Sequence, residues 1–360
     1  MKQIKLFDPF IDKKEENAIL QVLKSHFWAS GAGIKNVEKF EASFKNYIGC
    51  DECIAVNSGT AALHLALSLC DLKGKEVILP SLTFVSTAHA VVMNGGKPIF
   101  SEIDPDTLCL DSDKIENNIN KKTQVILPVH YGGMSCNLKE IKKICKNNDL
   151  DLIEDAAHAA GSEYKKDKIG THGKAVCFSF HPVKNLAMPT GGLIAINSKN
   201  SKSISNKLKS KRWCGISNRK NLEYDVSEVG WNYYMNEFSA SIGLIQLKRL
   251  QEKNAKRKKI AKIYSNEIKL ENKMAFNKDC SYHLYWIRVN NRNEFVKKMK
   301  NEGIEVGIHY KPIHTMTYYK NKIKLPITEK IGKEIISIPI HQNLTTDDVS
   351  KIIKAVNKFA

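Results

Sequence analysis

The chain has 360 residues, of which 42% are hydrophobic, so it can bury a large core, and its length favours one large domain with a smaller one. Its net charge of +18 raises the hypothesis of a nucleic-acid partner, because such partners are bound through Lys and Arg. No stretch approaches the roughly 20 apolar residues of a membrane helix and the N-terminus lacks a signal-peptide pattern, so we expect a soluble, cytoplasmic protein without a membrane partner.

The first part of the chain alternates helical patterns with short apolar strands bounded by Gly, Pro and Asn. Helices are predicted at 13–25, 36–49 and 61–72, and strands at 53–57, 76–80, 97–103, 123–130, 150–155, 175–181 and 192–198. This rhythm is typical of an α/β domain with a mainly parallel sheet.

The pattern of predicted elements changes after a basic helix at 242–264. Strand-like stretches at 281–289, 304–310 and 335–340 alternate with helices at 292–303 and 345–359, and Thr346 is the expected cap of the last helix. We therefore predict a large α/β domain at 1–245 and a small α+β domain at 246–360.

Much of the positive charge lies between residues 199 and 262, where sixteen Lys and Arg stand against five Asp and Glu. In the basic helix the apolar positions, among them Leu250 and Ile263, keep roughly one face and the lysines the other. A solvated helix face is the favoured interpretation, since no zinc-finger, basic-zipper or RNA-binding signature accompanies the charge. We expect no nucleic-acid partner.

Nine cysteines stand at irregular spacing, which in a chain of this size without a secretion signal predicts reduced thiols. Cys50 and Cys53 form the one C-x-x-C pair. A zinc site needs two further ligands at suitable spacing, and none is found, so no metal is expected.

The stretch "VNSGTAALHLAL" ends a predicted strand and opens directly into a helix. Backbone N–H groups and the hydroxyl of Thr60, beside Gly59, then meet at a positive helix N-terminus, which favours a phosphate. An ordinary capped helix explains the turn equally well.

Two further residues stand where strands end. Asp155 closes "LDLIED" and is either a helix cap or a functional anion at the sheet's carboxyl edge. Lys184 follows the strand "AVCFSF" in "SFHPVKN", where partial desolvation would lower the pKa of its amine toward nucleophilic use, although most lysines are simply solvated. Together, a phosphate cradle, an acid and a lysine are the parts that pyridoxal 5′-phosphate requires.

At this point the sequence resembles the DegT/DnrJ/EryC1/StrS sugar aminotransferases over nearly its whole length. The resemblance lies in "FEASFKNYIG", "AVNSGTAALHLAL", "LPSLTFVSTAHAVVMNGGKPIFSEID", "PVHYGG", "IEDAAHAAG", "FSFHPVKN", "GWNYYMNEFSASIGLIQLKRL" and "GIHYKPIH". It implies the fold type I architecture, a mainly parallel seven-stranded sheet with a smaller C-terminal α+β domain.

The resemblance also implies roles for the residues that surround the cofactor. Lys184 matches the lysine that forms the internal aldimine and then moves the proton between cofactor and sugar. Asp155 matches the acid that pairs with the pyridine nitrogen. His158 stands where Gln is common, near the ring hydroxyl, and Phe84 matches the aromatic that stacks on the ring, although core packing is the plain alternative.

Phosphate and substrate contacts follow in the same way. Gly59, Thr60 and Ser179 match phosphate contacts, and Asn232 matches an Asn donated by the neighbouring subunit, which implies a homodimer with shared sites. The loop "IHYKPIH" implies that His309, Tyr310 and His314 lie near the substrate. Arg212 and Arg219 are candidates for a diphosphate, with a solvated role equally open.

The function implied is transfer of an amino group from an amino acid, glutamate being expected, to a nucleotide-linked keto-sugar for a surface polysaccharide or another glycan. The form of the "HYKPIH" loop favours amination at C4, with C3 as the alternative. A DNA-binding regulator is the alternative from another class. One departure is "AMPTGG", since many members carry a Glu in a "TTGEGG"-like run after the lysine.

Overall fold

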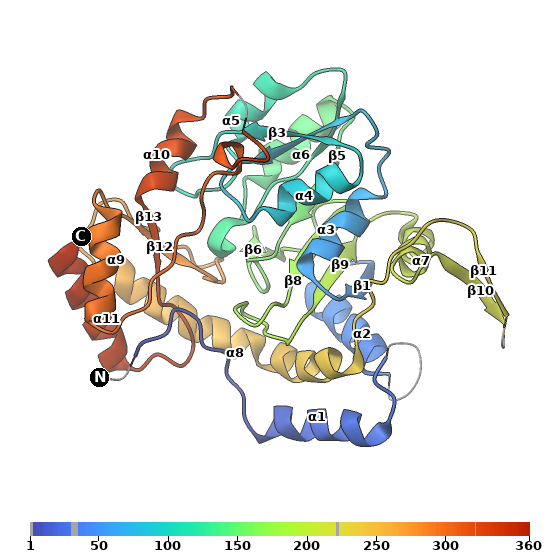
Figure 1. Ribbon diagram of the computed structural model, residues 1–360, viewed down its shortest axis with the longest axis horizontal. Coiled ribbons are helices and arrows are strands. Elements are labelled where there is room, and N and C mark those ends of the chain that lie inside the picture. The colour runs from blue at the N-terminus through green and yellow to red at the C-terminus, as the bar shows by residue number, and fades with distance from the viewer. Residues whose placement is uncertain (1–2, 30–34, 221–222, 321) are drawn as a thin grey trace.

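The computed structural model describes residues 3–29, 35–220, 223–320 and 322–360, and for 218–220 the backbone alone. Its body is a seven-stranded sheet in which β9 is antiparallel to both of its neighbours and the other neighbouring pairs are parallel (Figure 1). The strand order is β1 (Glu52–Val56), β9 (Gly192–Ile196), β8 (Ala175–Ser179), β5 (Asp151–Asp155), β4 (Thr123–Ile126), β2 (Glu76–Pro80) and β3 (Lys97–Ser101). The predicted fold class is confirmed.

The strands are continuous apolar runs because both faces of the sheet are covered. In β1, Cys53 and Ala55 point into one core, whereas Ile54 and Val56 point into the other. The first core is covered by α2 (Asn36–Ile48), α6 (Leu138–Asn147) and α8 (Glu237–Glu267), and the second by α3 (Gly59–Leu67), α4 (Ser86–Met93) and α7 (Ser201–Lys211).

The C-terminal region forms a smaller body at the left of Figure 1. It contains β12 (Tyr285–Arg288) paired with β13 (Ile335–Ile338), and the helices α9 (Arg292–Asn301), α10 (Pro326–Glu334) and α11 (Thr346–Phe359). The stretch 304–310, expected to be strand-like, makes only single bridges, such as Ile4 with Ile304. Residues that precede α1 (Lys13–Ser25) therefore pack on this body, although the sequence-based division assigns them to the large domain.

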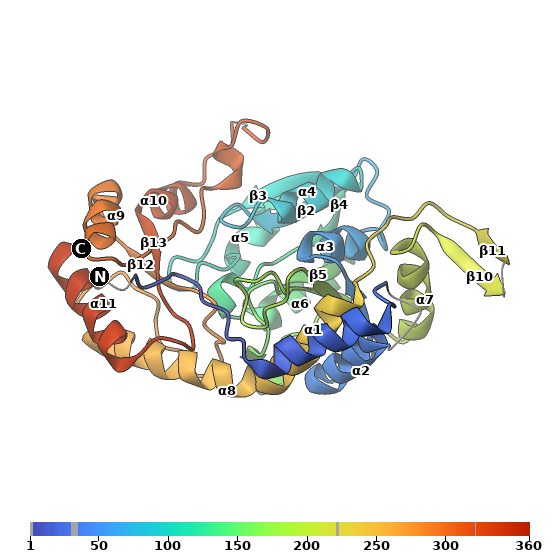
Figure 2. The same cartoon turned by 60° about the horizontal axis from the view of Figure 1, so that its bottom comes forward.

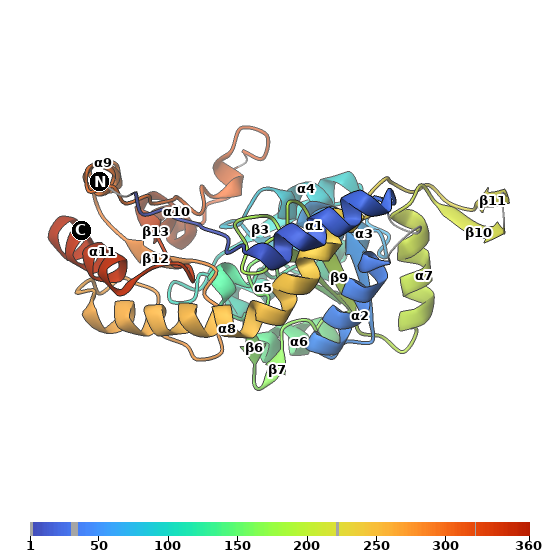
Figure 3. The same cartoon turned by 90° about the horizontal axis from the view of Figure 1, so that it is seen from below.

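Helix α8 runs through both parts of the molecule (Figures 2 and 3). The predicted boundary between residues 245 and 246 lies inside this continuous 31-residue helix. The amphipathic pattern holds only in part, because Lys253 and Arg257 are buried whereas Ile263 is 37% exposed. Part of the basic charge is thus internal, where it is unavailable to a nucleic acid.

A hairpin of β10 (Ile216–Lys220) and β11 (Glu223–Val226) projects from the opposite end (Figure 2). Just before it, Arg212 is turned inward, where its guanidinium pairs with Glu41 and donates a 2.7 Å bond to the Ala55 carbonyl. Arg212 thus supports the fold; the Arg219 side chain lies outside the described residues. The remaining elements are α5 (Ser112–Ile115), the pair β6 (Glu163–Tyr164) and β7 (Asp167–Lys168), and three 3₁₀ turns, η1 (Glu116–Asn118), η2 (Tyr131–Gly133) and η3 (Ile313–Thr315).

In the described part of the chain, no helix has the length and apolar character to cross a bilayer.

The cap of α11 is Thr345, one residue before the expected Thr346. Its hydroxyl accepts a bond from the Asp348 amide at 3.1 Å, and the Asp348 carboxylate accepts one from the Thr345 amide at 3.0 Å. We predict that Thr345→Ala lowers the free energy of unfolding by about 1 kcal/mol because it leaves a helix N–H unpaired. Urea unfolding is the measurement, and Thr346→Ala is the matched control. Equal losses in both variants would contradict this assignment of the cap.

Candidate active site

A cavity of about 400 Å³ lies at the carboxyl edge of the sheet. This edge is where ligands bind in open α/β folds, because strand ends and helix N-termini converge there. Nine of the predicted site residues line the cavity: Gly59, Thr60, Phe84, Asp155, His158, Ser179, Lys184, His309 and Tyr310.

One end of the cavity is the turn between β1 and α3. Ser58 caps α3, its hydroxyl accepting a 3.1 Å bond from the Ala61 amide, and the first turn of the helix carries no acidic residue. A Cβ on Gly59 would lie 2.7 Å from the Cβ of Ser179, so only glycine allows this approach. The turn therefore joins a helix N-terminus to the Ser179 hydroxyl, which suits a phosphate.

Asp155 ends β5 and is 4% exposed. Its carboxylate accepts bonds from the Ala157 amide at 3.0 Å and from the Thr87 hydroxyl at 2.8 Å. Burial raises the pKa of Asp155 in spite of these two bonds and of the positive charge of Lys184. Its donors are neutral groups, so a cationic N–H reaching it from the cavity would be strongly bound.

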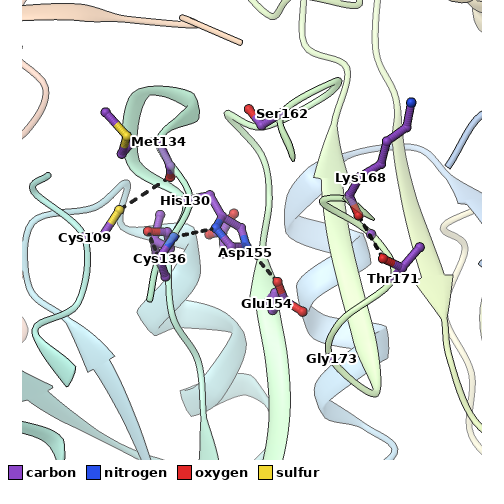
Figure 4. Close-up of polar contacts among 12 residues, drawn as sticks. Cys109, His130, Met134, Cys136, Glu154, Asp155, Ser162, Lys168, Thr171 and Gly173 are labelled. Atoms are coloured by element: carbon purple, nitrogen blue, oxygen red, sulfur yellow. Dashed lines mark hydrogen bonds and ion pairs between the residues drawn. The ribbon is translucent and has the colours of Figure 1, made fainter. Parts of the chain in front are cut away.

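The strand end that carries Asp155 is clamped from the adjoining segment (Figure 4). The His130 amide donates to the Asp155 carbonyl at 3.0 Å, and the His130 side chain bonds the carboxylate of Glu154 at 2.7 Å, both side chains being fully buried. Since side chains alternate along a strand, Glu154 points away from the face that Asp155 uses. Glu154 thus holds the strand end in place, whereas Asp155 lines the cavity.

Lys184 stands in the turn after β8, where its amide donates to the His181 carbonyl at 2.8 Å. Burial lowers the pKa of its amine to about 8, although Asp155 acts in the opposite direction. At neutral pH an appreciable fraction is therefore uncharged, as a nucleophilic amine must be.

His158 is fixed by two hydrogen bonds. Its Nδ1 accepts from the Gly132 amide at 3.2 Å, so the ring hydrogen is on Nε2, which donates to the Tyr310 hydroxyl at 3.1 Å. The Tyr310 hydroxyl consequently keeps its own hydrogen for a further acceptor.

The aromatic and histidine side chains predicted near the cofactor and substrate differ in their surroundings. Phe84 is 55% exposed at the cavity, so it does not serve core packing alone. His309 lines the cavity, and burial together with Lys184 lowers its pKa to about 4. His314 is not among the residues that line the cavity: it is 3% exposed and bonds the Ser81 hydroxyl at 2.7 Å, and its substrate contact stays a prediction. Asn232 also lies outside the lining and is exposed.

The unusual stretch "AMPTGG" packs on the phosphate turn. The Thr190 hydroxyl donates to the Asn57 carbonyl, and a Cβ on Gly192 would lie 2.2 Å from the Ser58 carbonyl oxygen. At the position where the resemblance leads us to expect an acid, this chain has the hydroxyl of Thr190, which ties the lysine loop to the turn.

Comparison with known proteins agrees with this geometry. A model of the DegT/DnrJ/EryC1/StrS aminotransferase family matches residues 9–357. The chain belongs to this family. Its pyridoxal phosphate-dependent members transfer amino groups, so the protein is an aminotransferase of the sugar-modifying kind.

Three relatives show how far the likeness extends. The spore coat polysaccharide biosynthesis protein SpsC of Bacillus subtilis is 32% identical over 97% of this chain and 95% of its own. The structure of PseC of Helicobacter pylori, an aminotransferase of pseudoaminic acid biosynthesis, covers 99% of both chains with a TM-score of 0.94 and 29% identity. The putative sugar aminotransferase Spr1654 of Streptococcus pneumoniae covers 99% of this chain and 98% of its own, with a TM-score of 0.94 and 26% identity, and has a form with pyridoxal phosphate.

The cavity fits the cofactor of this family. Asp155 is a buried carboxylate whose hydrogen-bond partners among the described residues are all neutral, which suits a protonated ring nitrogen. An amine with a pKa of about 8 suits an aldehyde, and the close approach at Gly59 suits a phosphate. Among the residues that the structure describes, no group of three or more His, Cys, Asp or Glu is arranged to hold a metal ion.

Two residues of the site were missed from the sequence. Thr87 bonds Asp155 from the first turn of α4, and His283 lies 3.3 Å from the Lys184 amine. Thr87 stands three positions after Phe84 in "LTFVST", a spacing that places both on one side of a helix start. No local pattern marks His283, because 99 residues separate it from Lys184.

Proposed function

We propose that the protein transfers an amino group from glutamate to a nucleotide-linked keto-sugar, at C4 of the sugar. The observation that carries the proposal is that Lys184 and Asp155 line one cavity together with Gly59 and Thr60 at the N-terminus of α3. An amine donor and a keto-sugar would use this cavity in turn.

Bound pyridoxal phosphate supplies an electron sink, because its protonated ring accepts the charge that develops when a C–H bond next to nitrogen is broken. In the proposal, Lys184 would hold the cofactor through its amine and, while that amine is free, would carry a proton to or from the substrate carbon. Asp155 holds the proton on the ring nitrogen, and Phe84 covers the ring face.

The remaining residues anchor the two ends of the ligand. Gly59, Thr60 and Ser179 hold the phosphate through amide and hydroxyl donors. His158 directs the Tyr310 hydroxyl, whose hydrogen is free for the ring oxygen or the sugar. The lowered pKa of His309 keeps its side chain neutral above about pH 4. In the proposal it accepts a hydrogen bond from the sugar or donates one to it without adding a charge.

The substrate class is supported by the relatives. SpsC is named for spore coat polysaccharide biosynthesis and PseC for the biosynthesis of pseudoaminic acid. Amination at C4 is favoured by the resemblance of the "HYKPIH" loop, and C3 is the second candidate.

The test is a panel of nucleotide-linked 4-keto and 3-keto sugars, each incubated with glutamate and the holoenzyme. Mass spectrometry of the products is expected to show an amine formed from a 4-keto sugar. Amination of 3-keto sugars alone would reject the C4 assignment, and turnover of neither would reject the substrate class.

A homodimer is part of the proposal. Large apolar side chains are exposed on α1 and in the segment that follows it. Leu20 is 48% exposed, Leu23 46%, Phe27 53% and Trp28 49%. A surface of this kind is typical of an interface, and Asn232 is then expected to reach the partner's phosphate. Light scattering is expected to show that the wild-type protein is a dimer. The variant Leu23→Glu should raise the dissociation constant of this dimer at least tenfold, and a monomeric wild-type protein would contradict the proposal.

We also place the enzyme in the cytoplasm. All nine cysteines are free thiols, even Cys50 and Cys53, whose sulfur atoms are 3.3 Å apart. Free thiols so close together are typical of a reducing compartment.

The reaction of the apoenzyme with pyridoxal phosphate should depend on pH through Lys184. Its pKa of about 8 means that the uncharged fraction rises as the pH rises through this value, so the attachment rate is expected to increase about tenfold from pH 7 to pH 9 and then level off. Stopped-flow absorbance checks this. A rate that still rises steeply above pH 10 would indicate an ordinary solvated lysine.

A further inference from the structure

His283 approaches the Lys184 amine from the C-terminal region of the fold. Its Nε2 lies 3.3 Å from Lys184 Nζ, and it is the one hydrogen-bond partner of that amine among the described residues. It stands two residues before β12 and is 2% exposed. The Lys184 amine therefore lies where the large domain contacts the C-terminal region.

The imidazole of His283 is held on both sides. It stacks on Phe7 with ring centres 5.6 Å apart and planes 17° from parallel, and it packs against His158 at 4.5 Å. Phe7 belongs to the N-terminal segment and His158 to the loop after β5, so two segments distant in sequence fix the ring. Such packing leaves Nε2 in a defined place.

His283 is uncharged in this position. Burial and the positive charges of Lys184 and Arg257 hold its pKa well below the usual range. A neutral imidazole accepts a hydrogen bond from an ammonium group or donates one to an amine. Its Nδ1 has no partner among the described residues, so no second bond competes for the ring's orientation.

We propose that His283 is a positioning residue that holds the Lys184 amine toward the cavity whenever this amine is not bound to the cofactor. The inference rests on the proposed role of Lys184. A lysine side chain has four rotatable bonds, and restricting them before reaction removes an entropic cost from the barrier. In the proposal the amine would be released when the donor binds and would attach again at the end of the cycle, so its position matters throughout the interval in which it is free.

The experiment uses the full-length protein freed of cofactor, so the readout does not depend on turnover. The rate of attachment of pyridoxal phosphate is followed by stopped-flow absorbance from pH 6 to pH 10 in wild type, His283→Phe and His283→Gln. Reduction with borohydride and peptide mapping verify that Lys184 carries the cofactor. Above pH 9 the amine is uncharged in wild type, so a slower reaction there reports position and not protonation.

His341→Phe is the matched control. His341 is also buried, bonds through Nε2 to the Lys5 carbonyl at 3.1 Å, and has an Nδ1 without a partner among the described residues. Unlike His283, its side chain bonds the N-terminal segment and not the Lys184 amine. Any general effect of replacing a buried histidine by phenylalanine appears in this variant.

We expect the plateau rate of His283→Phe to fall at least tenfold, and its pH midpoint to move below that of wild type because the ammonium form loses an acceptor. His283→Gln, which retains a polar end group, should recover part of the plateau, and His341→Phe should match wild type. If His283→Phe does not fold, His283→Leu replaces it with the same expectations. A plateau and midpoint equal to wild type in the folded apolar variant would overturn the inference, whereas attachment of wild type at another lysine would overturn the proposed function itself.

Discussion

Replacing Lys184 by alanine is expected to lower the rate of amino transfer by on the order of 10³-fold or more, because both the attachment point and the group that moves the proton are lost. The protein should still fold and bind the cofactor by its phosphate and ring contacts, since neither Asp155 nor the turn at Gly59 contacts the lysine through a hydrogen bond. Steady-state kinetics and cofactor binding by equilibrium dialysis measure the two effects separately.

The chain offers a matched control in Lys253. This lysine is 4% exposed, and burial also lowers its pKa to about 8, but it bonds Gln246 at 2.6 Å and lies over the ring of Phe10, outside the cavity. Lys253→Met is expected to retain the wild-type attachment of the cofactor. A low pKa alone therefore does not make a lysine the nucleophile; its position in the cavity does. Loss of attachment in Lys253→Met with attachment intact in Lys184→Ala would contradict the account.

Replacing Asp155 by asparagine is expected to lower the turnover rate about 10²–10³-fold, the range seen when one group that stabilises developing charge is removed. The amide keeps the shape of the side chain and its bond from Thr87, but it does not hold a proton on the ring nitrogen. The cofactor should still attach to Lys184, and its absorption spectrum should show the unprotonated ring.

Glu154→Gln separates this effect from a general loss of buried charge. Glu154 precedes Asp155 and bonds His130 in the interior (Figure 4). Because side chains alternate along a strand, it points away from the face that Asp155 uses. Its substitution should lower the melting temperature while the spectrum of the bound cofactor stays that of wild type. The account would be wrong if Glu154→Gln changed the ring's protonation and Asp155→Asn did not.

The fold was predictable because its signals are local. Short apolar runs between helical patterns indicate strands covered on both faces, and Asp155 and Lys184 could be placed at strand ends from their neighbours alone. The same logic placed the turn at Gly59 at the start of α3.

The rest of the site depends on contacts between distant segments, which one sequence does not reveal. The inward turn of Arg212 requires Glu41, and the contact of His283 with Lys184 requires the C-terminal region to fold back on the sheet. The burial of Lys253 and Arg257 breaks the amphipathic pattern of α8 for the same reason, since that helix is covered on different sides along its length. The bond of His314 to Ser81, 233 residues away, is likewise not visible in the sequence.

The central claim is that Lys184 carries pyridoxal phosphate. The direct measurement is borohydride reduction of the holoenzyme followed by proteolysis and mass spectrometry of every lysine-containing peptide. The account predicts that the reduced cofactor is found on Lys184, in the peptide that contains "HPVKN", and that Lys253 is unmodified. Stoichiometric modification of a different lysine, or of none, would contradict it.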